Sequence, residues 1–225
     1  MQLALKVDVD TYRGTREGVP RLVDALKKRG WPVDAFSAHF YPVSTGTPAS
    51  RVKLIEQWKE MLAKAGAPKK PLYETESNFG LAGLGFATFG PIGCGGSDKA
   101  ADWVAQTYLD TLRLGLDRAY WYAWAPEGDL LGIQMYADTP GAKAFQSMRT
   151  WLKGTRMTGC TTSGNVISCT FTKGRAKQTC SWATDGTAKF KAPAGTKQMC
   201  TSEGACSPAA PGATVKSRGP VRFSS

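Results

Sequence analysis

The feature that most constrains the fold is an alternation, from residue 15 to residue 154, between short apolar runs and longer stretches with helical periodicity. This alternation is typical of βαβ units, in which helices join parallel strands and cover the sheet. The predicted strands are Val33–His39, Pro71–Glu76 and Ala119–Trp124. An amphipathic helix precedes each strand, and a final helix spans Ala142–Leu152. The first part of the chain is therefore predicted to be an α/β protein with a parallel sheet.

The sequence changes in character after Gly154. Short segments rich in Thr, Ser and Gly alternate polar and apolar residues, with turn signals between them. This pattern predicts strands in the segments Val166–Phe171, Gln178–Trp182, Ala188–Ala192 and Val221–Phe223. We expect them to form a small antiparallel β-sandwich. The predicted domains are thus residues 1–152 and residues 153–225.

The positive charge of the chain is concentrated in its last third. Residues 1–151 carry 18 Lys/Arg against 16 Asp/Glu, whereas residues 152–225 carry 11 against 2, a net charge of +9. Such a segment would attract anionic polymers, including acidic polysaccharides and phosphate-bearing cell-wall polymers. Its Lys and Arg residues are scattered and form no run of five, so a solvated basic face is the alternative, and no nucleic-acid partner is expected.

The cysteines gather in the same region. No pattern of zinc ligands accompanies them, so disulfides and an oxidising compartment are predicted. The short loops favour Cys160 with Cys169 and Cys200 with Cys206, which leaves Cys94 and Cys180 unassigned. We expect a secreted or cell-wall-associated protein, although Met1–Asp10 has neither the basic nor the apolar region of a signal peptide. No transmembrane segment is expected either.

Two carboxylates end the second predicted strand. Glu74 and Glu76 are two positions apart, so a regular strand would point both side chains to the same face. A carboxylate at the end of an apolar strand is costly to bury without a partner or a function. Two carboxylates held in ion pairs inside the fold are the alternative interpretation.

Other chemically useful residues end the neighbouring strands. His39, the only histidine, ends the first predicted strand, and Trp121 and Trp124 lie in the third. Because the C-terminal ends of parallel strands meet at one edge, these residues and the Gly-rich segment 78–96 are candidates for a shared site. A packed histidine and a core aromatic stripe are the alternatives.

Together these motifs resemble a known family. The segment His39-Phe-Tyr-Pro42, the segment Pro71–Glu76 with Asn78-Phe-Gly80, and Tyr120–Trp124 look like strands six, seven and eight of clan A glycoside hydrolases, which are TIM (β/α)8 barrels. The similarity is greatest to the family 39-like enzymes of actinobacteria. The segment after Trp151 resembles the β-domain that follows the barrel in those enzymes.

The resemblance implies retaining hydrolysis of O-glycosidic bonds in a poly- or oligosaccharide, with Glu76 as the nucleophile. It implies carbohydrate as the binding partner, and the basic charge of residues 152–225 makes an anionic cell-wall polysaccharide the more specific expectation. The residues expected to bind substrate are His39, Tyr41, Glu74, Asn78, Trp121 and Trp124. Retaining hydrolysis needs two carboxyl groups and no cofactor, and the sequence has no nucleotide-binding or metal motif.

The sequence also departs from the family. The acid/base glutamate of the family lies in an Asn-Glu-Pro motif after strand four, and this sequence has no such motif. Strands one to four have no counterpart, and Leu3–Val9 corresponds at best to strand five. We therefore hypothesise that this chain is the C-terminal part of a longer enzyme and lacks the N-terminal half of the barrel. A non-catalytic remnant that binds cell-wall carbohydrate and an unrelated β/α protein are the alternatives.

Overall fold

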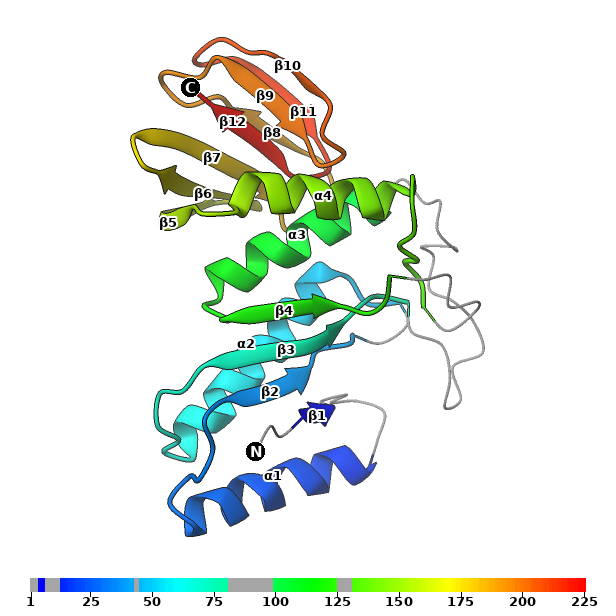
Figure 1. Ribbon diagram of the computed structural model, residues 1–225, viewed down its shortest axis with the longest axis vertical. Coiled ribbons are helices and arrows are strands. Elements are labelled where there is room, and N and C mark those ends of the chain that lie inside the picture. The colour runs from blue at the N-terminus through cyan, green and yellow to red at the C-terminus, as the bar shows by residue number, and fades with distance from the viewer. Residues whose placement is uncertain (1–3, 7–12, 43–44, 81–98, 125–130) are drawn as a thin grey trace. The chain divides into compact units, whose positions relative to one another are not determined.

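Figure 1 shows the chain as a computed structural model, which describes residues 4–6, 13–42, 45–80, 99–124 and 131–225. The chain divides into two compact units. The first comprises residues 1–94 and 114–133, and the second comprises residues 95–113 and 134–225. Cys94 and most of the Gly-rich segment 78–96 lie outside the described residues. The predicted domain boundary after residue 152 stays a prediction.

The first unit is built on a parallel sheet. Its strands follow the order β1-β2-β3-β4, with every neighbouring pair parallel. Their bounds are Ala4–Lys6, Phe36–His39, Leu72–Ser77 and Arg118–Trp121. The sequence prediction of parallel strands joined by helices is confirmed here, although the first and third predicted strands are shorter than expected. In the described residues β1 and β4 are the edge strands, and the sheet is not closed.

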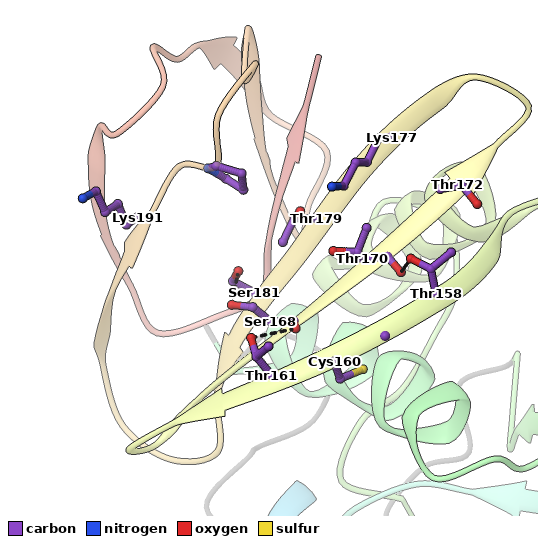
Figure 2. Close-up of a pocket in the computed structure, with 12 residues that line it drawn as sticks. Thr158, Cys160, Thr161, Ser168, Thr170, Thr172, Lys177, Thr179, Ser181 and Lys191 are labelled. Carbon is purple, nitrogen blue, oxygen red and sulfur yellow. Dashed lines mark hydrogen bonds between the residues drawn. The ribbon is translucent and has the colours of Figure 1, made fainter.

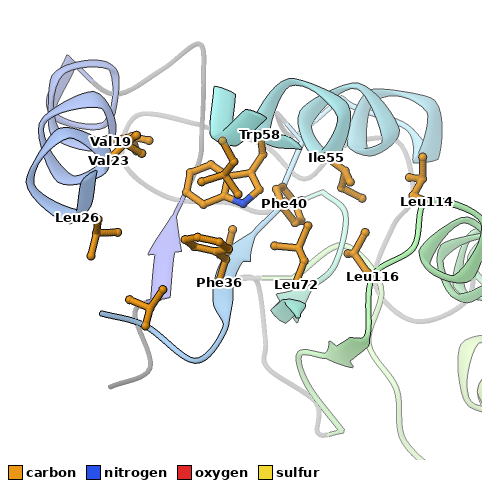
Figure 3. Close-up of a cluster of buried hydrophobic side chains, with 13 residues drawn as sticks. Val19, Val23, Leu26, Phe36, Phe40, Ile55, Trp58, Leu72, Leu114 and Leu116 are labelled. Carbon is orange, nitrogen blue, oxygen red and sulfur yellow. The ribbon is translucent and has the colours of Figure 1, made fainter. Parts of the chain in front are cut away.

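Helices α1 (Arg13–Lys28) and α2 (Pro48–Lys64) pack against this sheet. Figure 3 shows their apolar side chains meeting those of the strands in one cluster. Ile55 and Trp58 of α2 are almost fully buried against Phe40 and Leu72. Burying a side chain of this size stabilises the fold by about 1.5–3 kcal/mol. The helical periodicity in the sequence therefore predicts correctly which helix faces pack against the sheet of the first unit.

Helix α1 ends two residues before Gly30, and a glycine at such a position is a common sequence signal for the end of a helix. Gly30 adopts φ 71°, a left-handed conformation that glycine reaches without strain. Its backbone N–H donates to the carbonyl of Lys27 at 3.0 Å, and Trp31 N–H donates to Leu26 at 2.9 Å. These bonds satisfy carbonyls at the helix end and turn the chain toward β2.

The second unit contains two helices and two antiparallel sheets. Helices α3 (Ala100–Arg113) and α4 (Pro140–Leu152) pack together, with the rings of Tyr108 and Phe145 5.5 Å apart. One sheet has the order β10-β9-β12-β7-β6-β5, and β11 pairs with β8. The strands are β5 Arg156–Ser163, β6 Val166–Lys173, β7 Ala176–Ala183, β8 Ala188–Lys191, β9 Gln198–Thr201, β10 Cys206–Pro208, β11 Thr214–Ser217 and β12 Val221–Ser224.

Cysteines form a row across the six-stranded sheet. Disulfides join Cys160 to Cys169 and Cys200 to Cys206, the pairs that the short loops favour. Both bonds join residues that face each other on neighbouring strands. Cys180 lies opposite Cys169 in the same row and is buried and unbonded. Burial raises the pKa of the Cys180 thiol to about 12, so it has little thiolate character at neutral pH.

One carboxylate ties α3 to the loops of the β-strands. Asp102 accepts hydrogen bonds from Arg218 Nε at 3.0 Å and from Ser202 Oγ at 2.9 Å. A Cβ added to Gly219 would lie 1.6 Å from Asp102 Oδ1. The chain therefore needs glycine at this position so that Asp102 can keep both partners.

We predict that Gly219→Ala destabilises the chain by about 1–3 kcal/mol, because the added methyl group must displace the Asp102 carboxylate. Urea unfolding followed by circular dichroism measures the change. Gly159→Ala is the matched control, since a Cβ at Gly159 meets no atom within 4 Å. Equal stability losses in the two variants would contradict the proposed contact.

No helix in the described part of the chain has the length and apolar character needed to cross a membrane.

Candidate active site

Three side chains predicted for the site come together at the C-terminal ends of β2 and β3. Tyr41 donates its hydroxyl hydrogen to Glu76 Oε2 at 3.0 Å. His39 Nδ1 lies 3.3 Å from the same oxygen. The rings of His39 and Tyr41 meet edge to face, with their centroids 6.1 Å apart. Glu76 Oε2 is thus held between two polar side chains, and no described residue binds Oε1.

A β-bulge in β3 sets the direction of Glu76. Ala38 pairs with Glu74 and His39 with Glu76, so β3 has one more residue than β2 over this interval. The same shift occurs against β4. Because Ala38 and His39 face opposite sides of the sheet, their partners do too. The prediction that Glu74 and Glu76 point to the same face is therefore wrong, since a bulge breaks the two-residue repeat on which it rests.

Glu74 is paired with a helix residue instead. It has no exposed surface, and Arg51 of α2 is only 1% exposed. Arg51 Nε donates to Glu74 Oε1 at 2.9 Å, and its NH2 group binds Oε2. This two-pronged geometry satisfies both carboxylate oxygens. Glu74 was predicted to bind substrate, but in this structure its contacts fit a role in holding β3 against α2.

The sequence analysis missed Arg51, although a signal was present. Arg51 shares a helix face with Ile55 and Trp58, at spacings of four and seven residues, and all three are buried. An arginine on the apolar face of a helix that packs on a strand containing glutamate predicts a buried ion pair.

We predict that Arg51→Met destabilises the chain by about 3–5 kcal/mol, because Glu74 would keep a buried charge without a partner. The double variant Arg51→Met/Glu74→Leu should recover most of the loss, since it removes both charges. Urea unfolding measures each variant. Lys64→Met is the control, because Lys64 forms an exposed pair with Glu60 in the same helix, and it should change stability little. A double variant no more stable than the single one would contradict this assignment.

Asn78 connects the end of β3 to two other segments. Its Nδ2 donates to the carbonyls of Tyr122 at 2.7 Å and Ile133 at 2.8 Å. Its Oδ1 accepts from the N–H groups of Phe79 at 2.7 Å and Ile133 at 3.2 Å. The Asn78 side chain is fully buried, and both its amide nitrogen and its amide oxygen form hydrogen bonds within the protein. Asn78, predicted to bind substrate, has contacts that fit the positioning of the strand ends.

The two backbone segments that Asn78 joins approach each other closely at Phe79 and Gly132. Gly132 N–H donates to the carbonyl of Phe79 at 2.9 Å. A Cβ at Gly132 would lie 2.6 Å from that carbonyl oxygen, which is closer than real Cβ contacts. Only glycine allows the two backbone segments to approach in this way.

We predict that Asn78→Asp destabilises the chain by about 2–4 kcal/mol, because a carboxylate oxygen would face two backbone carbonyls in a buried position. Thermal unfolding followed by circular dichroism measures the effect. Gln57→Glu is the matched control, since Gln57 is exposed on α2 and solvent can screen the new charge. If the two substitutions shift the midpoint equally, Asn78 does not hold these segments together.

The aromatic residues of the third predicted strand take different positions. Trp121 is partly buried, and its ring lies 6.3 Å from the ring of Phe79. Trp124 is 58% exposed and follows β4. An exposed tryptophan near a strand end presents a flat apolar face to the solvent. Trp124 is thus open to solvent, whereas Trp121 belongs partly to the packed interior.

Three polar atoms near these strand ends are buried without a partner among the described residues. They are Thr75 Oγ1, Ser77 Oγ and Trp121 Nε1. A buried polar group normally forms a hydrogen bond, so each of these atoms is unusual for the interior of a protein.

Electrostatics keep Tyr41 a hydrogen-bond donor. Burial, followed by the charge of Glu76 and the hydrogen bond to it, raises the pKa of the Tyr41 phenol well above its ordinary value. Tyr41 therefore stays protonated at neutral pH. The described residues contain no group of three or more His, Cys, Asp or Glu side chains that could hold a metal ion. Glu76 is thus held by the phenol of Tyr41, with the imidazole of His39 beside the same oxygen.

Known structures share this fold. A family 39 glycoside hydrolase from the gut symbiont Bacteroides cellulosilyticus WH2 matches with a TM-score of 0.65 and 16% identity, over 89% of this chain and 46% of that chain. A glucosidase from Croceicoccus marinus matches with a TM-score of 0.59 and 12% identity, over 99% and 59%. A family 39 β-xylosidase from Caulobacter crescentus matches with 0.54 and 15%, over 92% and 54%.

The chain spans about half the length of these relatives. No family model matches the sequence. At such low identity the likeness establishes the fold alone. The chain thus has a glycoside hydrolase-like fold, and the expectation of such a fold is confirmed.

Proposed function

We propose that this chain is a glycoside hydrolase-like protein that carries the nucleophile side of a retaining glycosidase site, with Glu76 as the nucleophile. The observation that carries the proposal is the binding of Glu76 Oε2 by Tyr41 at 3.0 Å and by His39 at 3.3 Å, at the C-terminal ends of parallel strands. Parallel β/α enzymes build their sites at that end. A carboxylate fixed in this way is suited to attack on an anomeric carbon.

The geometry suggests different roles for the two carboxylate oxygens of Glu76. Tyr41 and His39 both contact Oε2, and Oε1 is the oxygen left to form the bond to the sugar. The hydrogen bond from Tyr41 and the close contact with His39 would orient the carboxylate before the reaction, which lowers the entropic part of the barrier. His39 and Tyr41 would also line the subsite of the cleaved sugar, and the exposed ring of Trp124 would stack on it.

The other predicted site residues, Glu74, Asn78 and Trp121, would act by positioning the residues that contact the substrate. Glu74, fixed by Arg51, would anchor β3 so that the bulge keeps Glu76 turned toward His39. Asn78 would hold the end of β3 beside the segment that leads to Trp124. Trp121 would support this arrangement from its partly buried position. These residues are positioning residues in the proposal, because their contacts are with the protein.

We further propose that residues 1–152 form part of a (β/α)8 barrel, with the described strands as about the fifth to eighth. Residues 153–225 would form an appended β-sandwich. The open sheet supports this idea, because β4 is an edge strand among the described residues, with exposed rings at Tyr120 within it and at Tyr122 just after it. The acid/base carboxyl group, about 5.5 Å from the nucleophile in retaining enzymes, would come from the other half of the barrel.

The proposed substrate is a poly- or oligosaccharide, and an anionic cell-wall polysaccharide is its more specific form. The proposed location is outside the cell, because two disulfides need an oxidising compartment. A second candidate function is a non-catalytic protein that binds cell-wall carbohydrate. The net charge of +9 on residues 152–225 favours it, since 11 Lys/Arg face only 2 Asp/Glu there.

We predict that Glu76 forms a covalent adduct with 2,4-dinitrophenyl 2-deoxy-2-fluoroglycosides of β-xylose or β-glucose. Dinitrophenolate leaves without protonation, so the reaction needs the nucleophile and not the acid. The fluorine slows hydrolysis of the adduct, which allows the intact chain to be weighed by mass spectrometry. The expected result is the addition of one fluorosugar, located at Glu76 by fragmentation.

The control variants separate the two candidate functions. Glu76→Gln should form no adduct, whereas Glu60→Gln should react like the native chain, because Glu60 lies exposed on α2. A folded native chain that binds polysaccharide but forms no adduct would refute the nucleophile and favour the binding protein. An adduct on another carboxylate would refute the assignment of Glu76.

A further inference from the structure

The second unit has an open trough on one face of its larger sheet. Strands β5, β6 and β7 form the floor, and Lys191 at the end of β8 lies across from them (Figure 2). Pro193 also lines the hollow. Its volume is about 650 Å³. All of its lining residues belong to the second unit, so this trough is distinct from the site around Glu76.

Hydroxyl groups of Ser and Thr side chains line the floor of the trough. Alternation along β6 and β7 sends their apolar residues to one face and their Ser and Thr residues to the other. Some hydroxyls are already used, since Ser168 and Ser181 bind each other at 2.8 Å. Among the described residues, no partner is found for the hydroxyls of Thr170, Thr172 and Thr179. The trough therefore offers donors and acceptors to a ligand rich in hydroxyl or carboxylate oxygens.

Ser181 shows that the trough is a built feature and not a flat polar surface. Its side chain is only 3% exposed, yet it lines the hollow together with Thr179 at 9%. Buried hydroxyls on a rigid sheet are held in fixed positions, which is a requirement for selective binding.

The charge of the trough is positive. Lys177 lies on β7 and Lys191 on β8, on opposite sides of the hollow (Figure 2). None of the described lining residues is acidic or aromatic. A neutral sugar bound by stacking would need an aromatic ring. The lining instead fits a ligand that carries both negative charge and oxygen atoms able to form hydrogen bonds.

The trough continues into a second hollow. This neighbour has a volume of about 310 Å³ and shares Lys177, Thr179 and Pro193 with the first. Two adjoining hollows with common walls suit a chain-like ligand better than a single small ion.

We propose that this trough binds a segment of an anionic polysaccharide whose carboxylates pair with Lys177 and Lys191, while its hydroxyl groups bond to Thr170 and Thr179. The ordered hydroxyl floor gives selectivity for a sugar chain, and the two lysines add attraction that weakens with salt. The site does not depend on Glu76 being a nucleophile and would stand if that assignment failed.

The test is binding of the full chain to polygalacturonate, measured by isothermal titration calorimetry at low ionic strength. Lys177→Gln/Lys191→Gln should weaken binding about tenfold, since two surface ion pairs are lost. Lys153→Gln/Lys216→Gln removes the same charge at exposed positions outside the trough, and should weaken binding less than about twofold. Circular dichroism confirms that each variant is folded.

Two further arms separate a sugar site from general charge attraction. Thr170→Val/Thr179→Val keeps the charge and nearly the shape, and should weaken polygalacturonate binding about threefold to tenfold by removing two hydrogen bonds. Dextran, which has the sugar hydroxyls without the charge, should not bind detectably. Inorganic polyphosphate, which has charge without sugar, should bind the two lysine double variants equally.

The proposal is overturned by any of three results. These are no binding of the native chain to polygalacturonate, an equal loss of affinity in the two lysine double variants, and native-like binding by the valine variant. An equal loss in the two lysine variants would assign the attraction to a general solvated surface.

Discussion

The buried ion pair between Arg51 and Glu74 is the constraint on which the first unit depends. Both side chains are almost fully enclosed, so β3 must face α2 at Glu74 or leave a charge unpaired in the interior. The bulge that follows then turns Glu76 to the opposite face, where Tyr41 and His39 hold it. One strand thus uses its first carboxylate to fix the architecture and its second to form the candidate site.

Much of this arrangement could be predicted from the sequence. The helical stripes, the glycine that ends α1, the parallel strands and the meeting of His39 with Glu76 all follow from local patterns. The opposite directions of Glu74 and Glu76 could not be predicted, because a bulge inserts one residue without changing composition or periodicity. The structural use of Asn78 was also hidden, since its partners are backbone groups of Tyr122 and Ile133, distant in the sequence.

The second unit illustrates a different limit. Alternation of polar and apolar residues predicted the strands, and loop length favoured the disulfide pairs that form. The polar half of that alternation, however, looks in the sequence like an ordinary solvated face. Only the placement of β8 across from β7 turns the Ser and Thr residues into the floor of a hollow with a lysine on either side. Concavity depends on contacts between distant strands and leaves no local signature.

The central claim is that β3 separates its two carboxylates, burying Glu74 and presenting Glu76. Carbodiimide coupling of glycine ethyl ester to the native chain, with the labelled sites located by fragmentation mass spectrometry, tests this most directly. The side chain of Glu76 is 36% exposed and that of Glu74 is 0% exposed. Of these two residues, the account predicts that only Glu76 is labelled in the native chain and that both are labelled after unfolding in urea. Equal labelling of Glu74 and Glu76 in the native chain would contradict it.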